Sequence, residues 1–169
     1  MSGIANVSEL LETMTDGVAD IVRREGSDRV VMIGIHTGGV WIARHLHRAL
    51  GMETPLGTLD ISFYRDDFSR IGMNPKVRPS NLPFQVEDRV IVLVDDVLYS
   101  GRTVRAALNE IFDYGRPAAV RLAVLVDRGD RELPIAADVT GTRVELDAGE
   151  QIKLGGPDPL ELTIKKRQS

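Results

Sequence analysis

The chain has 169 residues, of which 43% are hydrophobic and 27% are charged, and these values are ordinary for a globular protein. The sequence holds no cysteine, which excludes disulfide bonds, a thiolate nucleophile and cysteine-ligated metal sites. A net charge of −4 argues against a general electrostatic affinity for nucleic acid. Neither a signal-peptide pattern nor an apolar run of the roughly 20 residues that span a membrane is visible. We expect one cytoplasmic domain over residues 1–169, without membrane attachment.

Helix and strand patterns alternate along most of the chain. Apolar residues at helical spacing predict helices over 7–24, 39–50 and 103–114. Short apolar runs rich in β-branched residues predict strands over 29–35, 55–64, 90–94 and 120–127. Strands that alternate with helices of about a dozen residues indicate βαβ crossovers, so we expect an α/β fold with a central parallel sheet.

Two regions depart from this alternation. Residues 134–169 are divided by glycine and proline, and we expect peripheral strands there, over 136–141, 143–147 and 160–166. Residues 63–84 show no sustained period, and a connection of this length in a compact domain usually has a function. This segment carries the cations Arg65, Arg70, Lys76 and Arg78. In an acidic protein, these cations favour a mobile cover for an anionic ligand over a solvated loop.

The stretch VIVLVDDVLYSGRT, residues 90–103, has the composition of a ligand site at a strand end, where open parallel sheets bind ligands. Asp95 and Asp96 follow the predicted strand, and their carboxylates accept hydrogen bonds only, which suits the vicinal hydroxyls of a ribose. Residues 97–103 are expected to form a loop that opens a helix, where backbone amides and hydroxyls make an anion site. Gly101 lets that loop close around a phosphate. The stretch therefore predicts a ribose 5-phosphate site.

Two other interpretations of this stretch remain open. Phosphoacceptor receiver domains also carry an acidic pair after an apolar strand, although they carry it on the first strand, whereas this pair lies on a middle strand. A purely structural strand–turn–helix, with Thr103 as the helix cap, would also produce this pattern. A Walker loop is excluded, because its Gly-Lys-Ser/Thr sequence is absent.

The stretch resembles the phosphoribosyl diphosphate (PRPP) motif of type I phosphoribosyltransferases, and more narrowly that of the pyrimidine operon regulators with uracil phosphoribosyltransferase activity. The segments IGIHTGGVWIA (33–43), DISFYRDD (60–67) and GRPAAVRLAVLVDRGDRELPI (115–135) are also similar to that family. Together the matches cover most of the chain from residue 30 to residue 140. The resemblance implies the type I phosphoribosyltransferase fold: a central parallel sheet flanked by helices, a small hood, and a flexible lid loop over residues 63–84.

The resemblance also implies an activity and its ligands. Uracil and PRPP would give UMP and diphosphate, with Mg²⁺ held mainly through the substrate and Asp95 as a potential protein ligand. Expression of pyrimidine biosynthesis genes would respond to UMP or UTP, through binding to the leader RNA of a pyrimidine (pyr) operon. The chain would form a homo-oligomer, either a dimer or a tetramer. The alternatives are a nucleotide-sensing regulator with little or no turnover and a transferase for another nucleobase.

The family's functional positions fall on four groups of residues. The catalytic residues are Asp95, Asp96 and Arg65, and the PRPP or UMP phosphate and ribose are bound by Val97, Leu98, Tyr99, Ser100, Gly101, Arg102 and Thr103. The diphosphate loop is His36, Thr37, Gly38 and Gly39, and the family often has a non-proline cis peptide there. The uracil pocket is Val126, Asp127, Arg128 and Gly129, and the lid cations are Arg65, Arg70, Lys76 and Arg78.

The chain departs from the pattern of these regulators at basic positions. His36 and Gly38 stand where Lys and Arg are common, so we expect weaker PRPP binding and low turnover. Asp130 and Ala136 stand where RNA-binding members have His and Arg, whereas Arg131 is retained. Because phosphate contacts supply much of the affinity for RNA, these changes argue against tight binding to leader RNA.

Overall fold

The computed structural model describes residues 6–61 and 80–166, and within these ranges five strands form a parallel sheet. The strands are β1 (Val30–Ile35), β2 (Leu56–Leu59), β3 (Val90–Leu98), β4 (Ala119–Asp127) and β5 (Val139–Arg143). Their order across the sheet is β2-β1-β3-β4-β5, and every neighbouring pair runs parallel. The expected α/β fold is confirmed.

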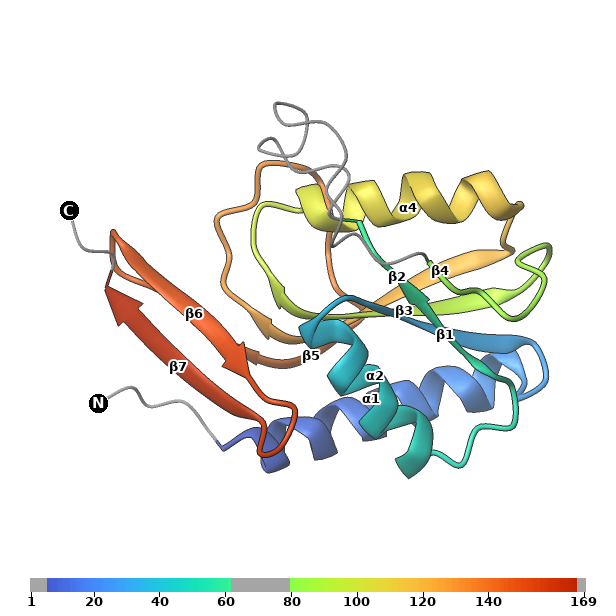
Figure 1. Ribbon diagram of the computed structural model, residues 1–169, viewed down its shortest axis with the longest axis horizontal. Coiled ribbons are helices and arrows are strands. Elements are labelled where there is room, and N and C mark those ends of the chain that lie inside the picture. Colours follow the sequence, from blue (N-terminus) through green and yellow to red (C-terminus); the bar gives the residue numbers. More distant parts are fainter. Residues whose placement is uncertain (1–5, 62–79, 167–169) are drawn as a thin grey trace.

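Helices cover both faces of this sheet. The helices are α1 (Val7–Glu25), α2 (Gly38–Ala49) and α4 (Arg102–Tyr114). Figure 1 shows α4 on one face and α1 with α2 on the other. Alternate residues of β1 and β3 therefore enter different cores: Met32 and Val92 pack with α1 and α2, whereas Ile33 and Leu93 pack with α4. Burial on both faces explains why these strands are continuous apolar runs.

Two further strands, β6 (Glu150–Gly155) and β7 (Glu161–Lys166), form an antiparallel hairpin. Ile152 of β6 is buried in the core beneath α1 and α2, and β6 also contacts β3. Figure 1 shows the hairpin beyond the end of the sheet at which the chain leaves β3 for α4. The hairpin therefore stands over the carboxyl ends of the parallel strands, as a small hood would.

Most of the predicted elements are confirmed, and the strand predicted over 136–141 is found over Val139–Arg143. The other corrections concern the following strands. The strand predicted over 55–64 ends at Leu59, and residues 62–64 lie outside the described ranges. The strand predicted over 90–94 continues to Leu98. Residues 144–147 are not a strand, and β6 was not predicted. Of the region 134–169, β5 is the edge strand of the main sheet, whereas β6 and β7 form a separate one.

The strand order places a topological switch point between β1 and β3. These strands are neighbours in the sheet, yet α2, which follows β1, and α4, which follows β3, lie on opposite faces. The two connections diverge outside the carboxyl ends, and in open α/β sheets such a switch point is where the ligand crevice lies. In the part of the chain that is described, no helix is long and apolar enough to cross a membrane.

Candidate active site

The paired carboxylates lie within β3 and not after it. Asp95 pairs with Val124 of β4, and the ladder continues to the pair Leu98–Asp127, so the loop expected over 97–103 begins only at Tyr99. Strand β1 pairs with β3 no further than Val94, so the end of β3 is open on the β1 side. The carboxylates therefore lie on a rigid strand, at the edge of the crevice.

Both carboxylates contact the turn that joins β1 to α2. A Cβ atom on Gly38 would overlap the Asp96 carboxylate, and a Cβ atom on Gly39 would lie 2.5 Å from the Val94 carbonyl oxygen and 3.3 Å from Oδ1 of Asp95. Only glycine fits against the backbone at position 39, whereas a side chain at position 38 would require the Asp96 carboxylate to shift. The expected cis peptide is present between His36 and Thr37. The predicted diphosphate loop and the predicted ribose acceptors thus form one wall of the crevice.

Local hydrogen bonds orient the pair. Asp95 is 6% exposed, and its Oδ1 accepts the backbone N–H of Asp96 at 2.9 Å. Asp96 is half-buried, and its Oδ1 accepts the N–H of Val97 at 2.8 Å. Because one oxygen of each carboxylate is held by the backbone, its orientation is fixed before a ligand arrives.

Residues 99–101 form a short turn between β3 and α4. Gly101 has a φ of +95°, in the left-handed region that favours glycine, and a Cβ atom there would lie 3.0 Å from Ile135. The Ser100 carbonyl oxygen accepts the N–H groups of Glu132 and Leu133, at 2.9 and 3.0 Å. In a trans peptide the N–H points opposite to the C=O. The N–H of Gly101 therefore points away from residues 132–133 and is available to an anion.

Other residues assigned to this phosphate group have structural contacts of their own. Leu98 is buried in the core beneath α4, and Val97 packs against the opposite core. The Arg102 side chain is paired with Glu132, with Nε 2.7 Å from Oε1, and its backbone N–H donates to the Ser100 hydroxyl. Thr103 lies in the first turn of α4. An anion bound at this turn would therefore meet backbone groups and hydroxyls more than the Arg102 side chain.

The end of β4 carries the residues assigned to the uracil pocket. A cavity of about 560 Å³ is lined by Asp127, Arg128, Gly129, Arg131, Ala136, Ala137, Arg143, Val144 and Glu145. Val126 is fully buried beneath it, in the core with α1 and α2. The Arg128 guanidinium stacks on the Tyr99 ring, with Cζ 3.8 Å from the ring centroid. Its Nε is buried and has no hydrogen-bond partner among the described residues.

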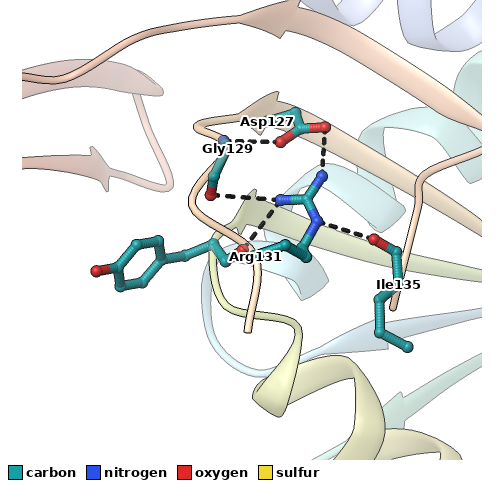
Figure 2. Close-up of polar contacts among 5 residues, drawn as sticks. Asp127, Gly129, Arg131 and Ile135 are labelled. Carbon is teal, nitrogen blue, oxygen red and sulfur yellow. Dashed lines mark hydrogen bonds and ion pairs between the residues drawn. The ribbon is translucent and has the colours of Figure 1, made fainter. Parts of the chain in front are cut away.

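Arg131 is the side chain whose role the sequence did not reveal. Figure 2 shows its guanidinium between Asp127 and the carbonyl groups of Gly129 and Ile135, and its Nη1 also donates to the Tyr99 carbonyl. The sequence showed Arg131 only as a retained position of the basic face of RNA-binding members. Residue types could not predict these contacts, because three of its four partners are backbone oxygens.

Asp127 is ionised in this environment. Burial alone would raise the pKa of its carboxyl group. Hydrogen bonds from Arg131 and from the N–H of Gly129, together with the charges of Arg131 and Arg143, outweigh burial and lower the pKa below its usual value. Asp127 is therefore a permanent anion at neutral pH, and its partner Arg131 neutralises it.

The lid cations Arg65, Arg70, Lys76 and Arg78 lie outside the described residues. Within 6–61 and 80–166, no three His, Asp or Glu side chains converge to hold a metal ion. Asp95 and Asp96 nevertheless offer carboxylate oxygens, which are the ligands that Mg²⁺ prefers. The residues therefore fit an ion that a substrate carries in and largely ligates itself.

Comparison with known proteins settles the family. The profile of the phosphoribosyl transferase domain matches residues 6–154. The chain belongs to the phosphoribosyltransferase family. It is 57% identical over 162 residues to the bifunctional protein PyrR of Nitrosococcus oceani, covering 95% of this chain and 92% of that protein. It is 55% identical to the bifunctional protein PyrR of Pseudomonas paraeruginosa, covering 96% and 95% of the two chains.

Solved structures agree on the architecture. A hypoxanthine-guanine phosphoribosyltransferase from Bacillus anthracis superposes with a TM-score of 0.67 at 19% identity, covering 85% of this chain and 83% of that one. The hypoxanthine phosphoribosyltransferase of Trypanosoma cruzi also gives a TM-score of 0.67 at 19% identity, covering 87% and 79%. Identity this low establishes the shared fold, whereas the relationship to PyrR rests on sequence.

Proposed function

We propose that the protein is a uracil phosphoribosyltransferase of the PyrR type. N1 of uracil attacks C1 of the PRPP ribose and loses its proton, the bond from C1 to diphosphate breaks, and UMP, diphosphate and the proton are released. The observation that carries this proposal is the crevice at the switch point, where Asp95 and Asp96 meet the Gly38–Gly39 turn on one side and the Tyr99–Gly101 turn follows on the other. That arrangement offers diol acceptors between two proposed anion sites.

Ribose 5-phosphate binds in this proposal along the end of β3. The carboxylates of Asp95 and Asp96 accept hydrogen bonds from the 2- and 3-hydroxyls, in orientations that the backbone N–H groups of Asp96 and Val97 help to set. The 5-phosphate lies at the start of α4, where the Gly101 N–H, the Ser100 and Thr103 hydroxyls and the helix dipole meet it. Both contacts fix C1 for attack.

Diphosphate binds at the turn before α2, against the amides of Thr37, Gly38 and Gly39. The lid cations, Arg65 first, would close over it and exclude water from an oxocarbenium-like transition state. Mg²⁺ belongs to the proposal as an ion carried by PRPP, with Asp95 as its potential protein ligand, and when bound it neutralises charge on the leaving group. His36 and Gly38 supply no permanent cation, which favours low turnover.

Uracil lies in this proposal at the cavity beside Asp127, Arg128 and Gly129. The cavity adjoins the phosphate turn through the Arg128–Tyr99 stack, so a base there and a phosphate at Gly101 are compatible with one nucleotide. Leaving a buried donor unpaired costs about 1–3 kcal/mol. A uracil carbonyl oxygen that accepted from Arg128 Nε would remove that cost.

The proposed regulatory role is a response of pyrimidine gene expression to UMP or UTP bound in the same crevice. Direct recognition of leader RNA is the weaker part of it, because Arg131 is occupied internally and its neighbour Asp130 is exposed and acidic. The assembly expected for such a regulator is a dimer or tetramer, which light scattering measures. A nucleotide sensor with little turnover is the second candidate, favoured by the missing cations at His36 and Gly38.

The test is formation of nucleotide from PRPP and each of uracil, hypoxanthine, guanine and adenine, with and without Mg²⁺. We expect Mg²⁺-dependent UMP and no purine nucleotide. Asp96→Asn should lower the rate by roughly 100-fold, the scale of losing one transition-state-stabilising group. Asp113→Asn, at an exposed position of α4, is the matched control and should retain the native rate. UMP binding without turnover would favour the sensor, and turnover of a purine alone would refute both.

A further inference from the structure

The Arg131 guanidinium joins three segments of the chain that meet behind the crevice. Its Nη2 donates to Asp127 Oδ2 at 2.8 Å, and its Nε donates to the Ile135 carbonyl at 2.8 Å. Its Nη1 donates to the Tyr99 carbonyl at 2.9 Å and reaches that of Gly129 at 3.5 Å. Figure 2 shows these partners converging on one planar group. Arginine has five N–H donors, so these four contacts leave little capacity for an external ligand.

The contact with Tyr99 acts on the phosphate turn. The Tyr99 carbonyl accepts from Arg131, and the next carbonyl, that of Ser100, accepts from the N–H groups of Glu132 and Leu133. The peptide groups after Tyr99 and after Ser100 are thus both hydrogen-bonded, through their carbonyl oxygens, to residues 131–133. Because N–H and C=O point in opposite directions in each plane, the N–H groups of Ser100 and Gly101 are turned toward the anion site.

The contacts with Asp127 and Gly129 act on the other half of the crevice. Asp127 ends β4 and lines the cavity assigned to the base, and its Oδ1 accepts the N–H of Gly129 at 3.0 Å. The Arg131 side chain is 23% exposed and that of Asp127 is 11% exposed, so solvent screens this ion pair only in part. The same guanidinium therefore fixes the base side and the phosphate side of the site.

We propose that Arg131 is a positioning residue of the transferase. It fixes the position of the phosphate turn, residues 99–101, relative to the base cavity at the end of β4, without touching the substrate. This inference rests on the proposed function, since it assumes that one nucleotide spans both halves. The resemblance had marked Arg131 only as a retained basic position of RNA-binding members. A misplacement of about 1 Å in such a site can cost about 100-fold in rate.

The test compares Arg131→Gln and Arg131→Lys with Arg116→Gln. Arg116 is an exposed arginine just before the amino end of β4, whereas Arg131 follows its carboxyl end. All assays run well below the melting temperature of each variant, with folding checked by circular dichroism. We expect Arg131→Gln to lower kcat/KM for PRPP about 100-fold, with at least a tenfold loss in kcat. Lysine keeps a charge for Asp127 but cannot reach four acceptors, so its loss should be smaller. Arg116→Gln should match the native protein.

A second readout does not depend on catalysis. Hydrogen exchange at the amides of Glu132 and Leu133, which donate to Ser100, should accelerate in Arg131→Gln, whereas amides in β1 should stay protected. Equilibrium binding of UMP should weaken in parallel. If the native protein bound UMP but did not transfer ribose phosphate to uracil, the proposed enzyme would fail while these two measurements still tested Arg131.

Two results would overturn the inference. One is a lower melting temperature for Arg131→Gln with native kcat, KM and UMP affinity, since Arg131 would then serve stability alone. The other is native kinetics and native exchange at residues 132–133 with weakened binding of a pyrimidine leader RNA, since Arg131 would then be an RNA contact.

Discussion

Gly38 and Asp96 lie so close that a side chain at position 38 would move the Asp96 carboxylate. The resemblance suggested only that position 38 had lost a cation. In the structure the space of a side chain at position 38 is filled by the Asp96 carboxylate, which a Cβ atom there would overlap. Any larger residue must displace a proposed catalytic group.

Gly38→Ala should therefore damage function more than stability. The added methyl group pushes Asp96 from the position that its bond to the Val97 N–H defines, so we expect kcat/KM for PRPP to fall about tenfold or more. Gly155→Ala is the control, because a Cβ atom there meets only the Glu161 carbonyl at 3.9 Å. Equal kinetics for the two variants would show that Asp96 accommodates the methyl group at no cost.

The lowered pKa of Asp127 predicts how the stability of the fold depends on pH. Its pKa is lowered in the folded protein, so its ionised form stabilises the fold above its unfolded pKa of about 3.9, and that stabilisation is lost as the pH falls through the folded value. The difference in unfolding free energy between the native protein and Asp127→Asn should therefore shrink as the pH is lowered from about 6 to below 4. Urea unfolding measures it, and a difference independent of pH would contradict the assigned ion pair.

At the scale of elements, the sequence located β3 but not its end. Apolar residues marked 90–94, and two aspartates suggested that the strand had ended. The ladder to β4 overrides that local preference, because Asp95, Val97 and Leu98 have partners on β4 even where β1 has stopped. A tertiary pairing of this kind leaves no trace in the residues themselves, whereas the helices, which carry their own periodicity, were placed within one or two residues.

The β6–β7 hairpin illustrates the same limit. Its strands bury one residue, Ile152, in the main core, so the six residues of β6 show too little alternation to predict a strand. Arg131 was missed for a related reason, since its role depends on backbone carbonyl oxygens, one of which belongs to the distant Tyr99, and backbone oxygens leave no signal in residue types. The residues that could be predicted, Asp95, Asp96 and Gly101, belong to one local motif.

Ile152 should anchor the hairpin. Ile152 is 7% exposed, and truncation of a buried isoleucine to alanine costs about 2–5 kcal/mol. We expect Ile152→Ala to lower the unfolding free energy within that range in chemical denaturation. The neighbouring Lys153 is exposed, and Lys153→Ala should change stability by less than about 0.5 kcal/mol. If the two variants were equally stable, the hairpin would not be fastened to the core through Ile152.

At the scale of the whole molecule, the sheet order decides where the chemistry takes place. Strand–helix alternation predicted a parallel sheet, but the order β2-β1-β3-β4-β5 and its switch point became visible only in three dimensions. That order brings the turn after β1, the end of β3 and the end of β4 together at the carboxyl ends of the strands. In the chain these segments are far apart, since β1 ends at Ile35 and β4 ends at Asp127. The account rests on one nucleotide bridging all three.

The most direct measurement is a crystal structure of the protein with UMP. We predict the phosphate at the Ser100–Gly101 amides, the ribose hydroxyls on Asp95 and Asp96, and the base in the cavity beside Asp127 and Arg128. Arg131 should keep its four partners and make no contact with the nucleotide. UMP bound elsewhere, or bound with its phosphate in the cavity at the end of β4, would contradict the account.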